Sequence, residues 1–370
     1  MTAETSAPTL VDWDAAVTTA SRLVKPGPKV TLEEAHALVA DLRRLALEAE
    51  DHVRAFTGLA PVGDPGKVVV VDRPGWAAAN VQGFEVLLAP VVAKLAAKRP
   101  PNALARAVGG KIAGAQVGVI LSYLAGRILG QYEIFLPPGA GQGRLTLVAP
   151  NILAAEQALK VDPQDFRLWV CLHEVTHKAQ FTAVPWLRDH LQGEIDAYLE
   201  ATDLDPAAVA KRVLGAIGSL AEAIRGNESV SLAEAIQTPE QRKVLDRLTA
   251  VMTLVEGHAE YVMDAVGPQV VPSVAKIRKV FDERRKQMTP LDKAVRQLLG
   301  LDAKMRQYAE GHVFVRHVVE AVGMERFNRI WTSPETLPTR AEITDPDGWI
   351  ARVLGPAEGS GEAAAAVDQA

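Results

Sequence analysis

Residues 162–181 read DPQDFRLWVCLHEVTHKAQF, and this stretch decides the expected fold and the expected chemistry. Asp162 is a typical helix N-cap, and Pro163 occupies the first helical position, where a missing N–H costs nothing. Apolar residues recur downstream at helical spacing. The sequence therefore predicts a helix that begins at Pro163 and contains the HEVTH segment.

Within this helix, His173, Glu174 and His177 form an HExxH motif. Residues four apart share one face of a helix, so both imidazoles can reach one metal ion. Zinc lowers the pKa of a bound water towards about 7, and Glu174 can accept the proton of that water. We therefore expect one Zn²⁺ per chain, with Glu174 as general base. The alternative is two surface histidines, with Glu174 paired to Lys178.

A catalytic zinc usually has three protein ligands, so a third is expected on another element. The best candidate segment is VEGHAEYVMDAVG, residues 255–267, at the end of a helix predicted to begin at Pro239 and end at Gly267. Stacked acids repel one another unless a cation lies opposite, which a metal ion and its histidines would supply. The alternative is a solvated acidic face. The acids that share this face are Glu256, Glu260 and Asp264.

HEVTH with a downstream glutamate resembles the gluzincin group of zinc peptidases, and EGHAEY resembles the EGxAxY box of aminopeptidase-N type enzymes. This resemblance implies that Glu256 is the third ligand and that Tyr261 belongs to the box. A thermolysin-like ExxxD match would make Glu260 the ligand, with Asp264 orienting a histidine; we favour Glu256. The 79 residues from His177 to Glu256 exceed the spacing in those peptidases. Inserted helices, beginning at DPAAVAKRVLG, must therefore fold away from the site.

The chain as a whole resembles a family found largely in actinobacteria. The likeness covers nearly all of residues 10–355 and is carried by VDWDAAV, VVVVDRPGWAAANVQGFE, LAGRILGQYEIFL and QYAEGHVFV. Its members are described as zincin-like hydrolases or zinc-dependent metalloproteases of unknown substrate, some associated with deazaflavin-cofactor biosynthesis. The resemblance implies a zincin-like fold and a zinc site, and it adds little about the substrate.

Three short segments are expected to be strands: residues 68–71, 132–136 and 144–148, with the last two joined as a hairpin through PPGAGQG. Residues 144–148 are either an edge strand that can pair with an extended peptide or an ordinary core strand. Glycines at four-residue spacing between residues 110 and 130 predict close helix packing. The expected fold class is α+β and mostly helical: a zincin-like metalloprotease fold with a small sheet and helical additions.

The composition of the 370 residues bounds the remaining possibilities. A net charge of -5 argues against a nucleic-acid-binding module, and a single cysteine, Cys171, excludes an internal disulfide framework and favours the cytoplasm. The longest weakly charged run, residues 112–126, is too short to span a membrane, so no membrane helix is predicted. The expected organisation is a disordered start at 1–8, one zincin-like unit at 9–355 (a helical region 9–130 and a metal-site region 131–355), and a disordered tail at 356–370.

Tyr308 and His312 are four residues apart on a further predicted helix, so they can point together into a cleft. Zincins often place a tyrosine or histidine where it can hydrogen-bond the developing oxyanion; the alternative is a packed tyrosine and a surface histidine. The predicted function is a zinc-dependent hydrolase, a metallopeptidase acting on a peptide or small amide. Two alternatives stay open: a non-catalytic binding or scaffold protein with this fold, and a zinc hydrolase of a non-peptide metabolite.

Overall fold

The computed structural model describes residues 11–64, 66–98, 103–137, 139–201, 238–286 and 301–355. The predictions for the two termini and for the inserted stretch that begins at Asp205 lie outside these residues. The described elements are α1 (Trp13–Leu23), α2 (Leu32–Thr57), β1 (Lys67–Val71), α3 (Arg73–Lys98), α4 (Ala103–Ala125), β2 (Gly130–Glu133), β3 (Arg144–Val148), α5 (Ala149–Leu159), α6 (Pro163–Ala183), α7 (Pro185–Glu200), α10 (Pro239–Ala265), α11 (Val274–Lys286), α13 (Leu301–Phe327), the 3-10 turns η1 (Asn328–Trp331) and η2 (Pro334–Thr336), α14 (Arg340–Thr344) and α15 (Pro346–Leu354).

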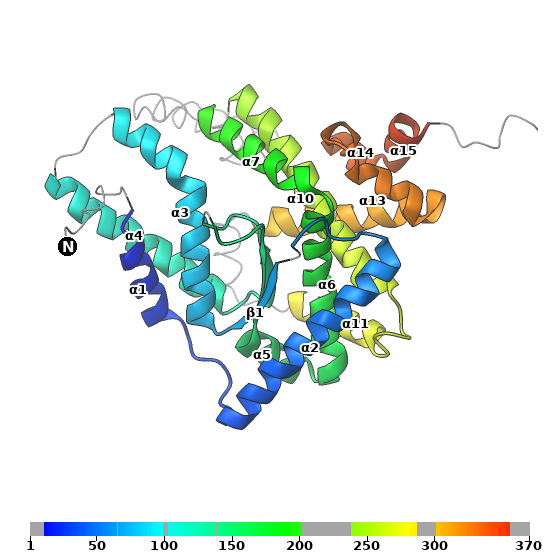
Figure 1. Ribbon diagram of the computed structural model, residues 1–370, viewed down its shortest axis with the longest axis horizontal. Helices are drawn as coiled ribbons and strands as arrows, with labels where there is room; N and C mark the ends of the chain where they lie inside the picture. Colours follow the sequence, from blue (N-terminus) through cyan, green and yellow to red (C-terminus); the bar gives the residue numbers. More distant parts are fainter. Residues whose placement is uncertain are drawn as a thin grey trace, which may run out of the picture.

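A three-stranded sheet in the order β1-β3-β2 lies among the helices (Figure 1). β3 pairs in parallel with β1 and antiparallel with β2, whose Gly130 lies opposite Leu147. The three predicted strands are therefore present, and β2 begins two residues earlier than expected. Because β3 is the central strand, the edge-strand alternative for residues 144–148 is wrong, and β2 is an edge strand of the described sheet. The mostly helical α+β class is confirmed.

Helix α6 packs under this sheet and carries the HEVTH segment. Its start follows the prediction, since the Asp162 side chain accepts hydrogen bonds from the backbone N–H groups of Gln164 and Asp165. Phe166 on α6 is fully buried in one hydrophobic cluster with Leu147 of β3. Helix α2 packs against the same helix. The backbone of α6 is thus held from two sides, which fixes the direction of its polar side chains.

Helices α10 and α13 cross at a pair of glycines. A Cβ atom on Gly257 would lie 2.1 Å from the carbonyl carbon of Gly311, and one on Gly311 would lie 2.1 Å from the carbonyl oxygen of Thr253. Neither helix can carry a side chain at this point without moving the other. The crossing brings the two backbones into contact immediately beside Glu256.

We expect Gly257→Ala to destabilise the protein by about 1–3 kcal/mol, because overpacking forces a backbone shift. Urea unfolding would measure the change. Gly193→Ala on α7 is the matched control: nothing lies within 4 Å of the added Cβ, so alanine should stabilise that helix by about 0.5–1 kcal/mol. Equal stabilities for the two variants would contradict the close contact.

Glycines spaced along α4 likewise allow it to pack closely against α1. A Cβ on Gly114 would lie 2.1 Å from the carbonyl oxygen of Asp12, and one on Gly118 would lie 2.6 Å from that of Ala16. The predicted close helix packing is therefore confirmed. By length and composition, however, α4 could also cross a membrane over the window Val108–Ala125, of which 28% is buried. That is weak support for a span, since core helices of soluble proteins pass the same test.

Candidate metal centre

Three side chains from two helices converge at the side of α6 that faces α10. The Nε2 atoms of His173 and His177 lie 3.2 Å apart, and Oε2 of Glu256 lies 3.7 Å from the first and 3.6 Å from the second. One ligand atom from each residue lies within 4.8 Å of the others. The structure thus brings together the three residues that the sequence predicts as metal ligands.

The donor set and its spacing fit a zinc ion. Two imidazole nitrogens and one carboxylate oxygen are typical zinc donors, and tetrahedral ligands about 2.0–2.1 Å from zinc lie about 3.3 Å from one another. The separations of 3.2–3.7 Å between the donors of His173, His177 and Glu256 are close to that edge length. Three protein ligands leave a fourth position for water or substrate, as in a catalytic rather than a purely structural site.

The electrostatics of the cluster favour a cation. Burial lowers the pKa of His177, yet the nearby carboxylates of Glu256 and Glu174, together with the hydrogen bond to Gln180, outweigh burial and raise this pKa to about 9. Burial raises the pKa of Glu174 to about 7, an effect that His177 opposes and Glu256 increases. A positive charge between these groups would therefore stabilise both carboxylates.

A cavity of about 250 Å³ opens beside His173 and Glu174. Its wall is largely apolar, with side chains from α6, α10 and α11, and the residues just before and at the start of β2 form another side. This cavity gives a small molecule or a side chain access to the general-base candidate. Its apolar lining residues are Ile128, Leu129, Trp169, Val170, Met263 and Phe281.

The three stacked acids of α10 have different partners. Glu256 faces the histidines, whereas Asp264 accepts a hydrogen bond of 2.9 Å from Nε of Arg278 and one of 3.3 Å from Trp169 Nε1. Glu260 is buried, with an oxygen 3.9 Å from the Arg278 guanidinium. The cation opposite Glu260 and Asp264 is thus Arg278 on α11. The solvated-face alternative is wrong for Glu260, and Asp264 is engaged with Trp169 and Arg278 rather than with a histidine.

Lys178, the alternative partner of Glu174, pairs with a different residue in the structure. Lys178 is buried, and its Nζ lies 2.6 Å from Oε1 of Glu50 on α2. The alternative that pairs Glu174 with Lys178 is therefore wrong. The Glu174 side chain instead lines the cavity and lies beside the metal cluster.

The other polar candidates are less closely connected to the cluster. The Tyr308 side chain lies outside the described part of the chain. His312 packs edge-on against the ring of Tyr261, with centroids 6.1 Å apart, and neither residue lines the cavity at His173. The assignment of Tyr308 and His312 to an oxyanion thus stays a prediction, and the position of His312 gives it no support.

Gln180, His258 and Gly130 are site residues that the sequence argument missed. Gln180 Oε1 lies 2.9 Å from Nδ1 of His177, and its Nε2 lies 2.9 Å from Nδ1 of the fully buried His258. Gln180 follows His177 by three residues, so helical spacing was a usable signal. His258 lies directly after Glu256-Gly257, but nothing local distinguishes it from a packed core histidine.

Gly130 lets the edge of the sheet approach Glu174, the general-base candidate. A Cβ atom at this position would lie 2.8 Å from Cγ and 2.9 Å from Cδ of Glu174. We expect Gly130→Ala to keep the metal and to reduce turnover, because the carboxylate must turn aside. Zinc content and initial rates would check this, and an unchanged rate would show that Glu174 does not need its present position.

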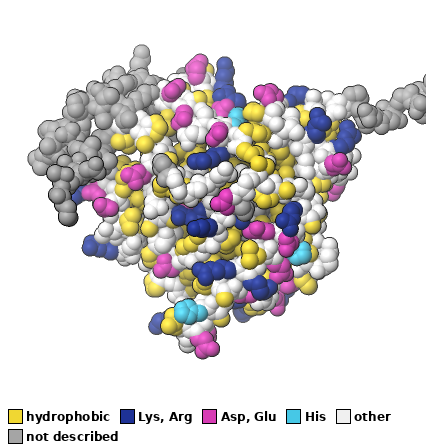
Figure 2. All heavy atoms as spheres, viewed as in Figure 1, with side chains coloured by type: hydrophobic (Ala, Val, Ile, Leu, Met, Phe, Trp, Pro, Cys, Tyr) yellow, Lys and Arg dark blue, Asp and Glu magenta, His cyan; other side chains and the backbone are white. Residues whose placement is uncertain are grey.

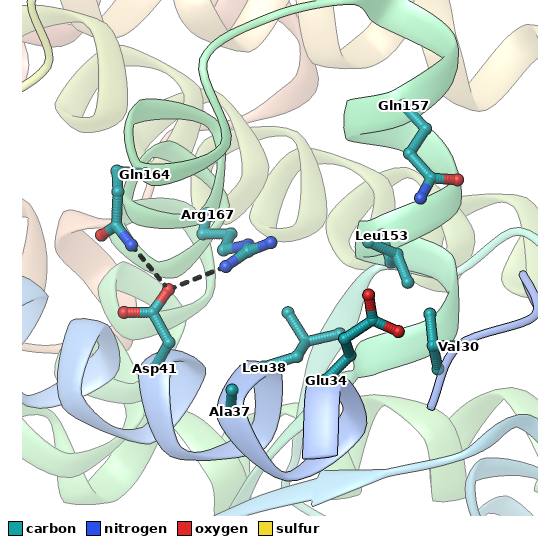
Figure 3. A pocket seen from close by; sticks show the side chains of 9 residues that line it. All are labelled: Val30, Glu34, Ala37, Leu38, Asp41, Leu153, Gln157, Gln164 and Arg167. Carbon is teal, nitrogen blue, oxygen red and sulfur yellow. Dashed lines mark hydrogen bonds and ion pairs between the residues drawn. The ribbon is translucent and has the colours of Figure 1, made fainter. Parts of the chain in front are cut away.

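A larger cavity, of about 500 Å³, lies elsewhere, between α2, α5 and the start of α6 (Figure 3). In its wall, Asp41 accepts a hydrogen bond from the Gln164 amide and forms an ion pair with Arg167. Arg167 also forms an ion pair with Glu156. These charges satisfy one another, and the cavity contains no part of the histidine cluster. Cavity volume alone would therefore not identify the candidate metal site.

A helix-borne HExxH pair completed by a glutamate from a second helix is the arrangement that defines a zincin-type metal centre. The chain belongs to the Zincin-like metallopeptidase family, which matches residues 11–350. It is also similar to a crystal structure from Chloroflexus aurantiacus whose description proposes a hydrolase with a novel fold, with 32% identity, a TM-score of 0.68, and coverage of 94% of this chain and 99% of that one. No curated protein matches the chain. The expected zincin-like family is therefore confirmed, while its actinobacterial distribution stays a prediction.

Proposed function

We propose that this protein is a zinc-dependent hydrolase of amide or peptide bonds. The observation that carries the proposal is the convergence of His173, His177 and Glu256 beside Glu174, at the wall of a cavity. Membership of the Zincin-like metallopeptidase family supports zinc as the metal. The description of the Chloroflexus aurantiacus structure supports hydrolysis as the reaction class.

Each residue has a distinct task in this proposal. His173, His177 and Glu256 would hold the ion, and zinc bound there supplies Lewis-acid polarisation of a carbonyl and activation of water. Glu174 accepts the proton of the attacking water and returns it to the leaving amine. Burial raises the pKa of Glu174, and a zinc ion at the cluster would lower it again, which leaves the carboxylate ready to accept a proton.

Two features support a peptide as the substrate. β2 is an edge strand of the described sheet, and its first residue, Gly130, lies against Glu174, so an extended chain paired with this edge would pass the general base. The cavity beside His173, whose wall is largely apolar but also includes Arg127, Glu260 and Arg278, has room for one large side chain of such a substrate. We assign the side chain next to the scissile bond to this cavity.

The decisive experiment combines metal analysis with an unbiased peptide-library digest. Purified protein should contain about one zinc per chain, and the zinc-loaded protein should cleave peptides at sites flanked by a large apolar residue. His177→Ala, which lacks a ligand, is the control for a contaminating peptidase. Full zinc occupancy without any cleavage would overturn the peptidase proposal and favour a binding protein or a hydrolase of non-peptide amides.

Acidic and basic side chains are interspersed over the face seen in Figure 2. This distribution agrees with the proposal that the substrate is a peptide or small amide rather than a nucleic acid, whose binding would favour a continuous basic surface. The cytoplasmic location and the absence of a membrane partner stay predictions.

A further inference from the structure

The Gln180 side chain is fully buried between α6 and α10 and has three polar neighbours. Its Oε1 lies 2.9 Å from His177 Nδ1, and its Nε2 lies 2.9 Å from the backbone oxygen of Val255 and 2.9 Å from His258 Nδ1. Val255 immediately precedes Glu256. One amide therefore contacts a histidine of the HExxH motif and the backbone beside the third ligand.

The Val255 carbonyl determines the direction of these hydrogen bonds. A backbone oxygen can only accept, so the NH₂ group of Gln180 must face Val255 and its carbonyl oxygen must face His177. An amide oxygen also only accepts, so Nδ1 of His177 must carry a hydrogen. The Nε2 atom of His177, which lies toward Glu256, is then the nitrogen available to a metal.

His258 holds the amide in this orientation. Its Nδ1 accepts the second hydrogen of the Gln180 amide, while its ring stacks on Phe327 at 5.5 Å and meets Trp331 edge-on at 5.4 Å. A flipped amide would put two oxygens together at Val255 and would leave buried polar groups unsatisfied, at a cost of about 1–3 kcal/mol each. Both the Val255 carbonyl and His258 therefore disfavour the flipped amide.

We propose that Gln180 is a positioning residue that selects the metal-binding tautomer of His177 and aligns α10 so that Glu256 meets it. The proposal rests on the metal-binding part of the proposed function and not on hydrolysis. It assigns to a glutamine the task that a carboxylate or a backbone carbonyl performs for histidine ligands in many metal sites. His258 acts through Gln180 and touches no ligand atom in this scheme.

The test compares two variants of nearly equal shape by zinc titration against a chromophoric chelator. Gln180→Met fills the space without an acceptor, so zinc affinity should fall about 10–100-fold. Gln180→Glu keeps the acceptor toward His177, and His258 can donate from Nδ1 to its second oxygen, but that oxygen also faces the Val255 carbonyl. Its zinc affinity should therefore fall, but by clearly less than that of Gln180→Met. Thr182→Val is the control: this buried hydroxyl on α6 donates only to the Lys178 carbonyl, and its loss should not change zinc affinity.

Two results would overturn the proposal: wild-type affinity in folded Gln180→Met, or an equal loss in Gln180→Glu and Gln180→Met. A second measurement applies even if Gln180→Met does not fold. In cadmium-substituted wild-type protein, NMR coupling between the metal and the imidazole protons identifies the coordinating nitrogen. Coordination through Nε2 of His177 supports the tautomer argument, and coordination through Nδ1 refutes it. Neither readout depends on finding a substrate.

Discussion

Glu256→Ala should bind zinc far more weakly than wild type. The loss of affinity should exceed the 10–100-fold that is typical when a residue contacting a ligand, rather than the metal itself, is changed. The reason is the loss of the only carboxylate in the three-residue cluster, which leaves two imidazoles. Equilibrium dialysis with metal analysis would measure the affinity. The variant should remain folded, because Glu256 is partly exposed and its α10 neighbours keep their apolar contacts.

Glu260→Ala is the matched control, one helical turn away on the same face. Its carboxylate lies toward Arg278, so its removal should change zinc affinity less than removal of Glu256. Some loss of stability is expected, because Arg278 would lose one of the carboxylates that surround it, although it keeps its hydrogen bonds to Asp264. A weaker zinc complex for Glu260→Ala than for Glu256→Ala would reverse the ligand assignment.

Glu174→Gln should retain zinc and lose hydrolysis by about 10²–10⁴-fold, the usual contribution of a positioned general base. Glutamine has almost the same shape, but its amide cannot accept the proton of the attacking water. Turnover of a substrate from the peptide-library digest, measured beside zinc content, would separate the two effects.

Glu50→Gln makes the same chemical change on α2, at a carboxylate that pairs with Lys178 of α6. Glu50 pairs with Lys178 and does not line the cavity at His173, so this variant should keep near wild-type turnover. Full activity in Glu174→Gln would remove Glu174 from the mechanism. A similar loss in both variants would show that the effect is a general disturbance of α6.

The parts of the site that follow from local rules could be predicted from the sequence. Asp162 and Pro163 set the start of α6, and the four-residue spacing of His173 and His177 then places both on one face. The start of α10 was equally readable, because Thr238 forms a capping box with Gln241. The acidic face of α10 also predicted an opposing cation, since like charges at this spacing repel.

The remaining site residues depend on contacts between distant segments. The acidic stripe required a cation without indicating that Arg278 of α11 supplies it for Asp264. Gly130 approaches Glu174 only because β2 pairs antiparallel with β3 above α6. No periodicity within one segment encodes such an approach. The Gln180–His258 contact likewise requires α6 and α10 to be docked first.

The separation of the ligands along the chain also orders events in time. A ribosome adds about 5–20 residues per second, so the separation of 79 positions from His177 to Glu256 corresponds to a delay of roughly 4–16 s. A nascent chain that exposes only the two histidines offers a metal two of its three ligands. If the cluster holds zinc as proposed, tight loading would have to follow the docking of α10 on α6, and the bound ion would mark chains that have completed this docking.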